Sequence, residues 1–232
     1  MSDMHLLDQL INETAKGSYL AKVISVQDPE NLSRVQIRLL SFDQAENQDA
    51  EIWARVAVPF AGDNHGAFLI PNVDDEVLVT FINGDTRFPI VIGSLWNGRN
   101  SVPETLGGSG DNVDRWSITG KLGTRIAIEE ENASRAKVLI TTPNGVSAEL
   151  TDAGGGKIEF KTSGTTLTID NQGVTVNTPM NLTVQATQVS ISAAMVTVDA
   201  GMSKFSGVVQ ADTVICNSII SASYTPGAGN IW

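Results

Sequence analysis

Residues 157–200 read KIEFKTSGTTLTIDNQGVTVNTPMNLTVQATQVSISAAMVTVDA, and this stretch decides the fold. Along it, apolar residues recur in pairs two positions apart: Ile158 with Phe160, Leu167 with Ile169, Val174 with Val176, Leu182 with Val184, Val189 with Ile191, and Val196 with Val198. Residues two apart share one face of a strand, so each pair predicts a short strand with one buried side. The first members of successive pairs lie 9, 7, 8, 7 and 7 residues apart. This spacing predicts a repeat of very short β-strands.

Strands this short need neighbours that cover their apolar side. Two apolar residues per strand make too narrow a face for an independent sandwich, and open edges favour aggregation. The pattern leaves two ways to close: one chain coils into a solenoid, or three copies wrap around a common axis. A one-chain β-helix uses coils of about 20 residues or more, whereas this repeat supplies one face per copy. We therefore expect an intertwined, trimeric β-helix, or β-prism, with the twelve paired residues as its core.

Length and charge restrict the class of protein. The chain has 232 residues, a formal net charge of −11 and one cysteine. A trimer would carry three times −11, or −33, which disfavours nucleic acid as a partner because its phosphates are bound by Lys and Arg. No apolar run approaches the roughly 18–20 residues of a membrane span. Cys216 cannot form an intrachain disulfide, and within residues 213–216 it is interpreted as a small buried apolar residue rather than a reactive thiol.

The N-terminal part carries a different pattern. Leucine and isoleucine at helical spacing within residues 4–13 predict a short amphipathic helix that either docks a partner or caps the next domain. The first 17 residues lack the parts of a secretion signal, so synthesis in the cytoplasm is expected. From Tyr19 onward, five or six strands are predicted, at residues 20–26, 33–39, 53–58, 66–71, 76–81 and 89–96. Strands in this number without a helical crossover predict a small closed barrel.

Four motifs in this region carry a family resemblance. They are EIWARVAVP at 51–59, GAFLIPNVDDEVLV at 66–79, NGDTRFP at 83–89 and GSLWNG at 93–98. In this order they resemble the OB-fold domain of contractile-tail spike proteins, a family that includes phage baseplate assembly protein V and the VgrG spikes of type VI secretion and extracellular injection systems. Asp74 stands where the family commonly has Gly, and Thr86 stands where it has Pro. The resemblance implies an OB-fold barrel followed by a β-helix needle.

The same resemblance implies a domain order and a function. We expect an N-terminal segment at 1–17, an OB-fold domain at 18–100, a linker at 101–116 and the spike at 117–232. The implied function is that of a non-enzymatic baseplate spike in a phage tail, a type VI-like machine or an extracellularly released injector. Its OB end would join a separate hub or baseplate protein. Its needle would contact the target membrane only mechanically.

The C-terminal end is the expected site for a partner at the apex. Resemblance to other spikes implies a dock for a PAAR-type tip protein, and the candidate contact residues are Tyr224, Pro226, Ile231 and Trp232. The alternative is that Tyr224 and Trp232 fold over the last layer and cap the needle themselves, because an open β-helix end leaves backbone groups unpaired.

The sequence predicts no catalytic, cofactor-binding or metal-binding site. His5 and His65 are the only histidines, and neither has a companion at metal-ligand spacing. Glu129, Glu130 and Glu131 are interpreted as a solvated turn rather than a paired-carboxylate or Ca²⁺ site. The remaining alternatives for function are a trimeric adhesive fibre or carbohydrate-binding tip, a polysaccharide-active monomeric β-helix, and an OB-type binder of single-stranded nucleic acid. The residues that would serve the last of these are Trp53, Phe68, Arg34, Arg38 and Arg55.

Overall fold

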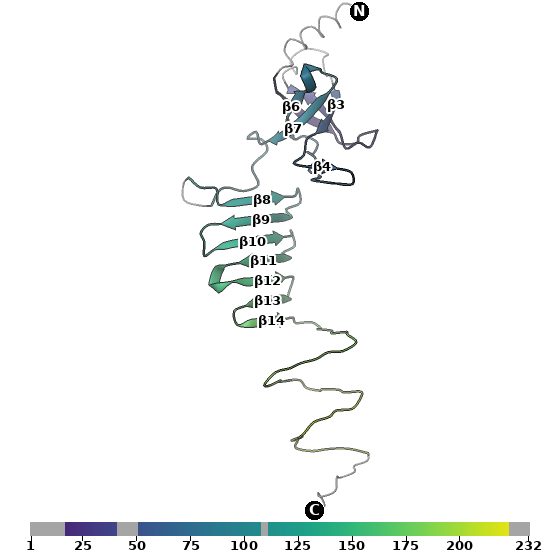
Figure 1. Cartoon of the computed structure of the whole chain (residues 1–232), viewed down its shortest axis with the longest axis vertical. Coiled ribbons are helices and arrows are strands. Elements are labelled where there is room, and N and C mark those ends of the chain that lie inside the picture. Colours follow the sequence, from purple (N-terminus) through teal and green to yellow (C-terminus); the bar gives the residue numbers. More distant parts are fainter. Residues whose placement is uncertain (1–16, 41–50, 108–110, 223–232) are drawn as a thin grey trace, which may run out of the picture. The chain divides into compact units, whose positions relative to one another are not determined.

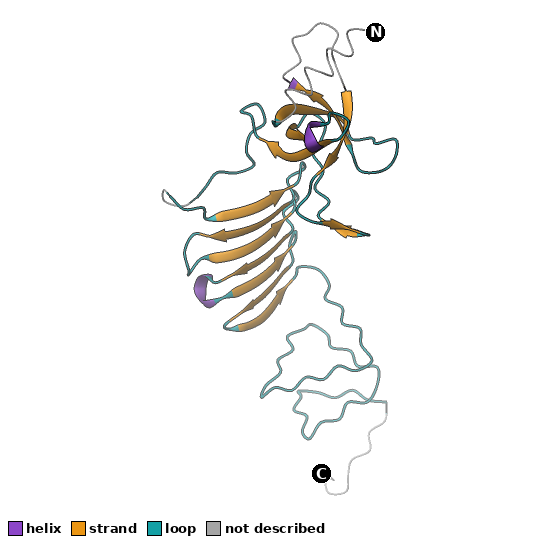
Figure 2. Ribbon diagram, turned by 45° about the horizontal axis from the view of Figure 1, so that its top comes forward, coloured by secondary structure: helices purple, strands orange, loops and turns teal. Residues whose placement is uncertain are grey.

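The computed structural model describes residues 17–40, 51–107 and 111–222 of the chain. These residues form strands, turns and extended segments with two short 3-10 turns and no α-helix, which confirms the all-β fold class (Figures 1 and 2). Contacts divide the chain into two units, Met1–Asn181 and Leu182–Trp232. The helix predicted at residues 4–13 and the four predicted tip-docking residues lie outside the described residues.

A closed five-stranded barrel forms the first part of the first unit. Its strands are β1 (Tyr19–Ser25), β2 (Val35–Leu39), β3 (Glu51–Val56), β6 (Glu76–Phe81) and β7 (Pro89–Leu95). They close in the order β1-β2-β3-β7-β6, and β6 pairs back onto β1, so the barrel leaves no open edge. The alternation along these strands points every second side chain inward. The core consists of Ala21, Val23, Val35, Ile37, Ala54, Val77, Val79, Phe81 and Val91.

One predicted barrel strand, at residues 66–71, is wrong. Residues 67–71 belong to no strand and follow the small hairpin of β4 (Ala61–Gly62) and β5 (His65–Gly66). Gly66 has a φ of +155°, and a Cβ there would lie 2.9 Å from the Phe60 carbonyl oxygen, so the chain turns at this glycine. The barrel closes with the other five strands, and Phe68 remains 77% exposed.

A seven-stranded antiparallel sheet follows. Its strands are β8 (Arg115–Thr119), β9 (Arg125–Glu130), β10 (Ala136–Thr141), β11 (Ser147–Thr151), β12 (Lys157–Lys161), β13 (Thr166–Asp170) and β14 (Gly173–Asn177). Each strand pairs with the next along the chain, so the order in the sheet is the order in the sequence (Figure 1). Because consecutive strands reverse direction, the turns alternate between the two margins of the sheet. β8 and β14 form its open edges.

The second unit differs from the predicted repeat of strands. Residues 182–222 contain no strand in the single chain and follow an open, winding path (Figure 1). We call these residues the winding segment. The three strands predicted between residues 182 and 198 are therefore absent from the single chain. A strand persists only where its backbone groups pair with a neighbour, and the described part of one chain provides no such neighbour for this segment. Cys216, predicted as buried, is exposed in the single chain for the same reason.

Candidate functional site: an assembly surface

One face of the sheet is apolar from its first strand to its last. The register aligns its side chains in two columns, because each residue lies opposite the next member of its column on the neighbouring strand. We call this surface the apolar face. The first column is Trp116, Ile128, Val138, Leu150, Ile158, Ile169 and Val174, and the second is Ile118, Ile126, Ile140, Ala148, Phe160, Leu167 and Val176.

The apolar face is open to solvent in the single chain. Ile118 is 61% exposed, Trp116 51% and Phe160 48%. Among the described residues of the sheet, the buried apolar side chain is Ala127, which lies on the opposite face. A continuous exposed apolar surface of this kind marks an interaction site. In the described part of the chain, no second layer covers this face.

The structure brings half of the predicted core residues together on this face. The six are Ile158, Phe160, Leu167, Ile169, Val174 and Val176, on β12, β13 and β14. The sequence prediction of the core missed its continuation to β8, although the pair Val138 and Ile140 has the same two-residue spacing.

The other half of the predicted core is not buried and not brought together in the single chain, which does not test a core formed by three copies. These residues lie in the winding segment, each more than half exposed: Leu182, Val184, Val189, Ile191, Val196 and Val198. Val184, for example, is 68% exposed and belongs to no strand. The physical reason is that a lone extended segment has no second layer to cover its apolar side. The burial of all twelve residues at a trimer axis stays a prediction.

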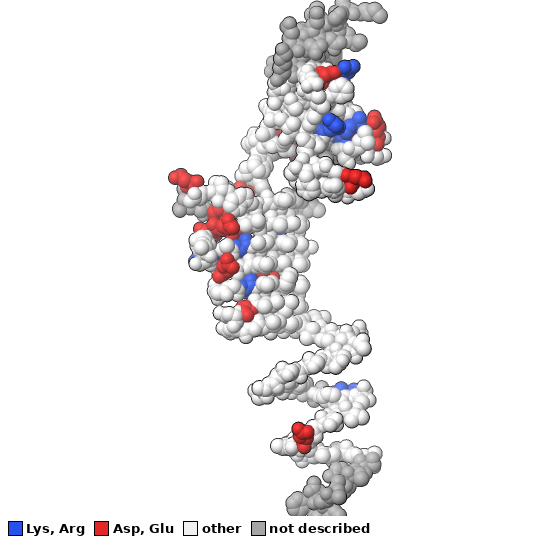
Figure 3. All heavy atoms as spheres, in the orientation of Figure 1, with Lys and Arg blue, Asp and Glu red and all other residues white. Residues whose placement is uncertain are grey.

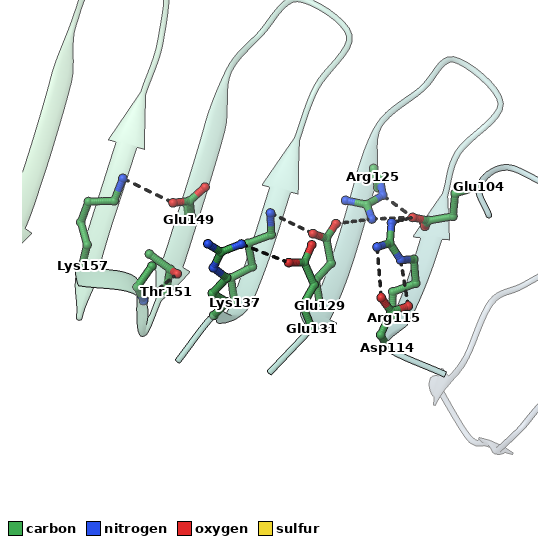
Figure 4. Close-up of polar contacts among 12 residues, drawn as sticks. Glu104, Asp114, Arg115, Arg125, Glu129, Glu131, Lys137, Glu149, Thr151 and Lys157 are labelled. Atoms are coloured by element: carbon green, nitrogen blue, oxygen red, sulfur yellow. Dashed lines mark hydrogen bonds and ion pairs between the residues drawn. The ribbon is translucent and has the colours of Figure 1, made fainter. Parts of the chain in front are cut away.

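On the opposite face of the sheet, charged side chains form ion pairs with one another (Figure 4). Arg125 Nη2 lies 2.7 Å from Glu104 Oε2 and 2.7 Å from Glu129 Oε1, and Lys137 Nζ lies 2.8 Å from Glu129 Oε2. Ser117 Oγ also donates to the Glu104 carboxylate. We call this surface the ionic face. The interpretation of Glu129 as part of a solvated turn is therefore wrong: it is a buried residue of β9 with two cationic partners.

The electrostatics of the ionic face follow from these contacts. Hydrogen bonds from Arg125 and Ser117 hold the pKa of the Glu104 carboxyl below its usual range. Lys137 and then Arg125 do the same for the pKa of Glu129. Both carboxylates are thus ionised at neutral pH, and their charges are met within the chain. The ionic face needs no partner, whereas the apolar face does.

Two of the three basic residues proposed for a nucleic-acid site are paired within the barrel. Arg34 makes two hydrogen bonds to the Asp28 carboxylate and lies 5.8 Å over the Trp53 ring. These bonds hold the pKa of Asp28 well below its usual range. Arg38 pairs with Glu51 at 3.1 Å. Of the basic residues proposed for a nucleic-acid site, Arg34 and Arg38 are therefore neutralised by carboxylates of the barrel itself.

The described residues contain no group of three or more His, Cys, Asp and Glu placed to hold a metal ion. His65 lies exposed on β5, with Nδ1 3.0 Å from the Asp63 carbonyl oxygen. No helix in the described part of the chain is long and apolar enough to cross a membrane.

Comparison with known proteins assigns the barrel. Residues 19–96 match the family described as type VI secretion system/phage-baseplate injector OB domain. The barrel is similar to this domain over all five of its strands, and we call it the injector OB domain after this match. This match confirms the resemblance carried by the four motifs between residues 51 and 98. All five strands of the barrel lie inside the matched range.

Individual relatives of the injector OB domain include proteins named as spike proteins. The type VI secretion system spike protein VgrG3 of Vibrio cholerae is 34% identical over 96 residues, which are 39% of this chain and 9% of that protein. VgrG1a of Pseudomonas aeruginosa is 35% identical over 78 residues, 34% of this chain and 12% of that protein. A Vibrio cholerae protein named actin cross-linking toxin VgrG1 is 38% identical over 60 residues, 26% of this chain and 6% of that protein. The chain thus spans between 6% and 12% of the length of these relatives.

Proposed function

We propose that this protein is a structural central spike of a contractile injection machine, and that three copies assemble through the apolar face. One observation carries the proposal: an injector OB domain is followed in the same chain by a sheet with one complete apolar face left open. The similarity to proteins named as type VI spike proteins supports the same role.

The apolar face provides the driving force for assembly. Full burial of a large apolar side chain contributes roughly 1.5–3 kcal/mol, so each half-exposed residue would add about half of that on closure. The contribution repeats on every strand from β8 to β14, which favours a covering layer of the same length. Copies of the same sheet, arranged around an axis that crosses the strands, supply a layer of matching length and chemistry.

The winding segment would complete the needle. Its valines and isoleucines are exposed and its backbone has no ladder partner in the described part of one chain. In a trimer, the equivalent segments of the other two copies would run beside it and supply both hydrogen bonds and apolar contacts. Strands that pair between chains open only when the whole assembly opens, so the shaft would resist local unfolding.

The two ends of the spike would bind other components of the machine. The injector OB domain would join a separate hub or baseplate protein. At the other end, Tyr224, Pro226, Ile231 and Trp232 would dock a PAAR-type tip protein. Function in this proposal is mechanical: the needle transmits the force of contraction to the target envelope, and no residue is catalytic. The protein would reside in the assembled particle.

The test is the solution mass of the purified protein by light scattering. We expect 73.8 kDa, three times the chain mass of 24.6 kDa, with part of the trimer surviving denaturing detergent at room temperature. A mass of 24.6 kDa at all accessible concentrations would refute the trimeric spike. In that case the adhesive and enzymatic alternatives would return. Retention of single-stranded DNA that weakens with salt would instead favour the nucleic-acid alternative.

A further inference from the structure

The turns of the sheet form two margins of different chemistry. The acidic margin consists of residues 130–135, 152–156 and 170–172, and the basic margin consists of residues 119–124, 142–146 and 161–165. The acidic margin carries Glu130, Asp152 and Asp170, and its Glu131 is already paired with Arg135. The basic margin carries Lys121 and Lys161 and has no Asp or Glu in these ranges. Figure 3 shows the acidic side chains gathered along one margin of the sheet.

Among the margin charges, Glu131 and Arg135 pair with each other, and Lys121 interacts electrostatically with Asp74. Four margin side chains form no ion pair within the described part of the chain: Glu130, Asp152, Asp170 and Lys161. On the ionic face, Glu129, Glu149 and Glu159 all have cationic partners. The Asp170 carboxylate accepts hydrogen bonds from the backbone N–H groups of Gln172 and Gly173 in its own turn. The two margins therefore leave opposite charges available on opposite sides of the same sheet.

A hollow at the acidic margin adds a shape to the charge. It has a volume of about 600 Å³ and is lined by apolar side chains of the apolar face, such as Ile128, Val138, Leu150 and Ile158. Its charged lining residues are Glu130, Asp152 and Asp170 together with Lys137 and Lys157. The two lysines are already paired with Glu129, Glu149 and Glu159, so the carboxylates carry the unpaired charge of the hollow. The turns of the basic margin present exposed apolar side chains: Leu122, next to Lys121, is 86% exposed, and Val146, in a turn without a lysine, is 46% exposed. A hollow with apolar walls and unpaired carboxylates would accommodate an exposed apolar side chain from the basic margin of another copy.

The topology determines which turns would meet. When three sheets close a ring around an axis, each sheet presents one margin to a neighbour and the other margin to the next neighbour, a heterologous contact. Turns at the acidic margin follow β9, β11 and β13, and turns at the basic margin follow β8, β10 and β12. Copies related by a three-fold axis stand at the same height. The basic turns after β10 and β12 therefore each face the space between two turns of the acidic margin, whereas the turn after β8 lies beyond the first acidic turn.

We infer that the acidic margin of each sheet receives the basic margin of the next copy, with Val146 entering the hollow and Lys161 lying between Asp152 and Asp170. The inference rests on the proposed trimer. It adds which margins of neighbouring copies are in contact and that all three copies point the same way along the axis. Two acidic margins repel each other, as do two basic ones, so a two-fold pairing of sheets is disfavoured. Opposite margins attract, which favours a ring in which every copy points the same way.

A pair of cysteines tests this contact. In a Cys216→Ser background, Asp152→Cys is combined with Lys161→Cys. Within one chain, Asp152 lies in the turn before β12 and Lys161 is the last residue of β12, whose five residues span about 17 Å, far beyond the roughly 7 Å limit for a disulfide. A disulfide between them must therefore join two chains. We expect mild oxidation to give a covalent trimer of 73.8 kDa, three times 24.6 kDa, on a non-reducing gel.

The control pair is Lys121→Cys with Lys161→Cys, two positions on the same margin, which we expect to form no covalent trimer. Native mass is measured for every variant before oxidation. A native trimer without the Asp152–Lys161 disulfide, or with equal cross-linking in the control, overturns the inference and leaves the proposed function intact. A monomeric unmodified protein overturns the proposed function itself.

A charge exchange provides a second measurement. Lys161→Glu would place a third carboxylate beside Asp152 and Asp170 in each contact. We expect it to raise the concentration at which half of the protein is trimeric by about tenfold. The double variant Lys161→Glu with Asp152→Lys restores opposite charges and is expected to recover most of that loss. A double variant no better than Lys161→Glu alone overturns the inference.

Discussion

Val176→Asp tests the proposed trimer on the apolar face. Val176 lies on β14 and is 48% exposed in the single chain, so the aspartate is tolerated there by the monomer. In the trimer, each chain loses the further burial of a half-exposed valine, about 0.7–1.5 kcal/mol. Each chain also buries an unpaired carboxylate, which costs at least about 1 kcal/mol. The three chains together lose at least about 5 kcal/mol of assembly free energy.

This loss of assembly free energy raises the protein concentration at which half of the chains are trimeric. The midpoint of a monomer–trimer equilibrium depends on the square root of the equilibrium constant, so about 5 kcal/mol raises the midpoint concentration about 60-fold. Sedimentation equilibrium over a dilution series measures that midpoint. The matched control is Thr175→Asp, which places the same charge one residue earlier, on the opposite face of the same strand. Equal midpoints for the two variants would refute the assignment of the apolar face to the interface.

Three further predictions concern the needle, the ionic face and the barrel. Val184→Asp or Ile191→Asp would bury three unpaired charges in one layer of the needle and abolish trimers, and recovery of soluble trimer from either variant would contradict its axial placement. The pKa values of Glu104 and Glu129 lie below the ordinary value of 4.5, so their contribution to stability is complete above about pH 4.5 and is lost as the pH falls through the lowered values. We expect the melting temperature to fall in this acid range, and to fall less in Arg125→Met; identical acid profiles would exclude the ion pairs as the cause. Ile37→Ala in the barrel core should lower the free energy of unfolding by about 2–5 kcal/mol without changing the trimer mass, as measured by urea denaturation of the barrel signal.

The sequence predicts the barrel well because its strands alternate strictly. Val35 and Ile37 point inward while Gln36 and Arg38 point outward, and the structure confirms this division. Residues 66–71 have a similar apolar content but no neighbour left to pair with once five strands have closed the barrel. Whether a barrel closes depends on how all of its strands pair. The apolar pattern of one segment therefore cannot show whether that segment has a place in the barrel.

The sequence predicts the ionic face poorly. Glu129 belongs to a run of three glutamates, and such runs usually lie in solvent. Its partners Arg125 and Lys137 lie on its own strand and on the neighbouring strand β10. Arg125 is four residues away in the sequence, but in a strand that spacing indicates a shared face only once the strand itself is known. The contact with Glu104, from the segment before the sheet, has no sequence signal.

The difference between the two halves of the repeat has a physical cause in the connections. In the sheet, glycines with positive φ, such as Gly145 (+80°), Gly164 (+97°) and Gly173 (+136°), allow the chain to reverse and pair with itself. Between residues 174 and 200 there is no glycine, although the apolar pairs continue at nearly the same spacing. Glycine favours such reversals but is not required for each of them, because residues 131–135 join β9 to β10 without one. Where the chain does not reverse, the next strand does not lie against the last one and needs partners from elsewhere. The same apolar pattern therefore gives an intrachain sheet up to Asn177 and, after it, a segment whose strands are expected to form only against other copies of the chain.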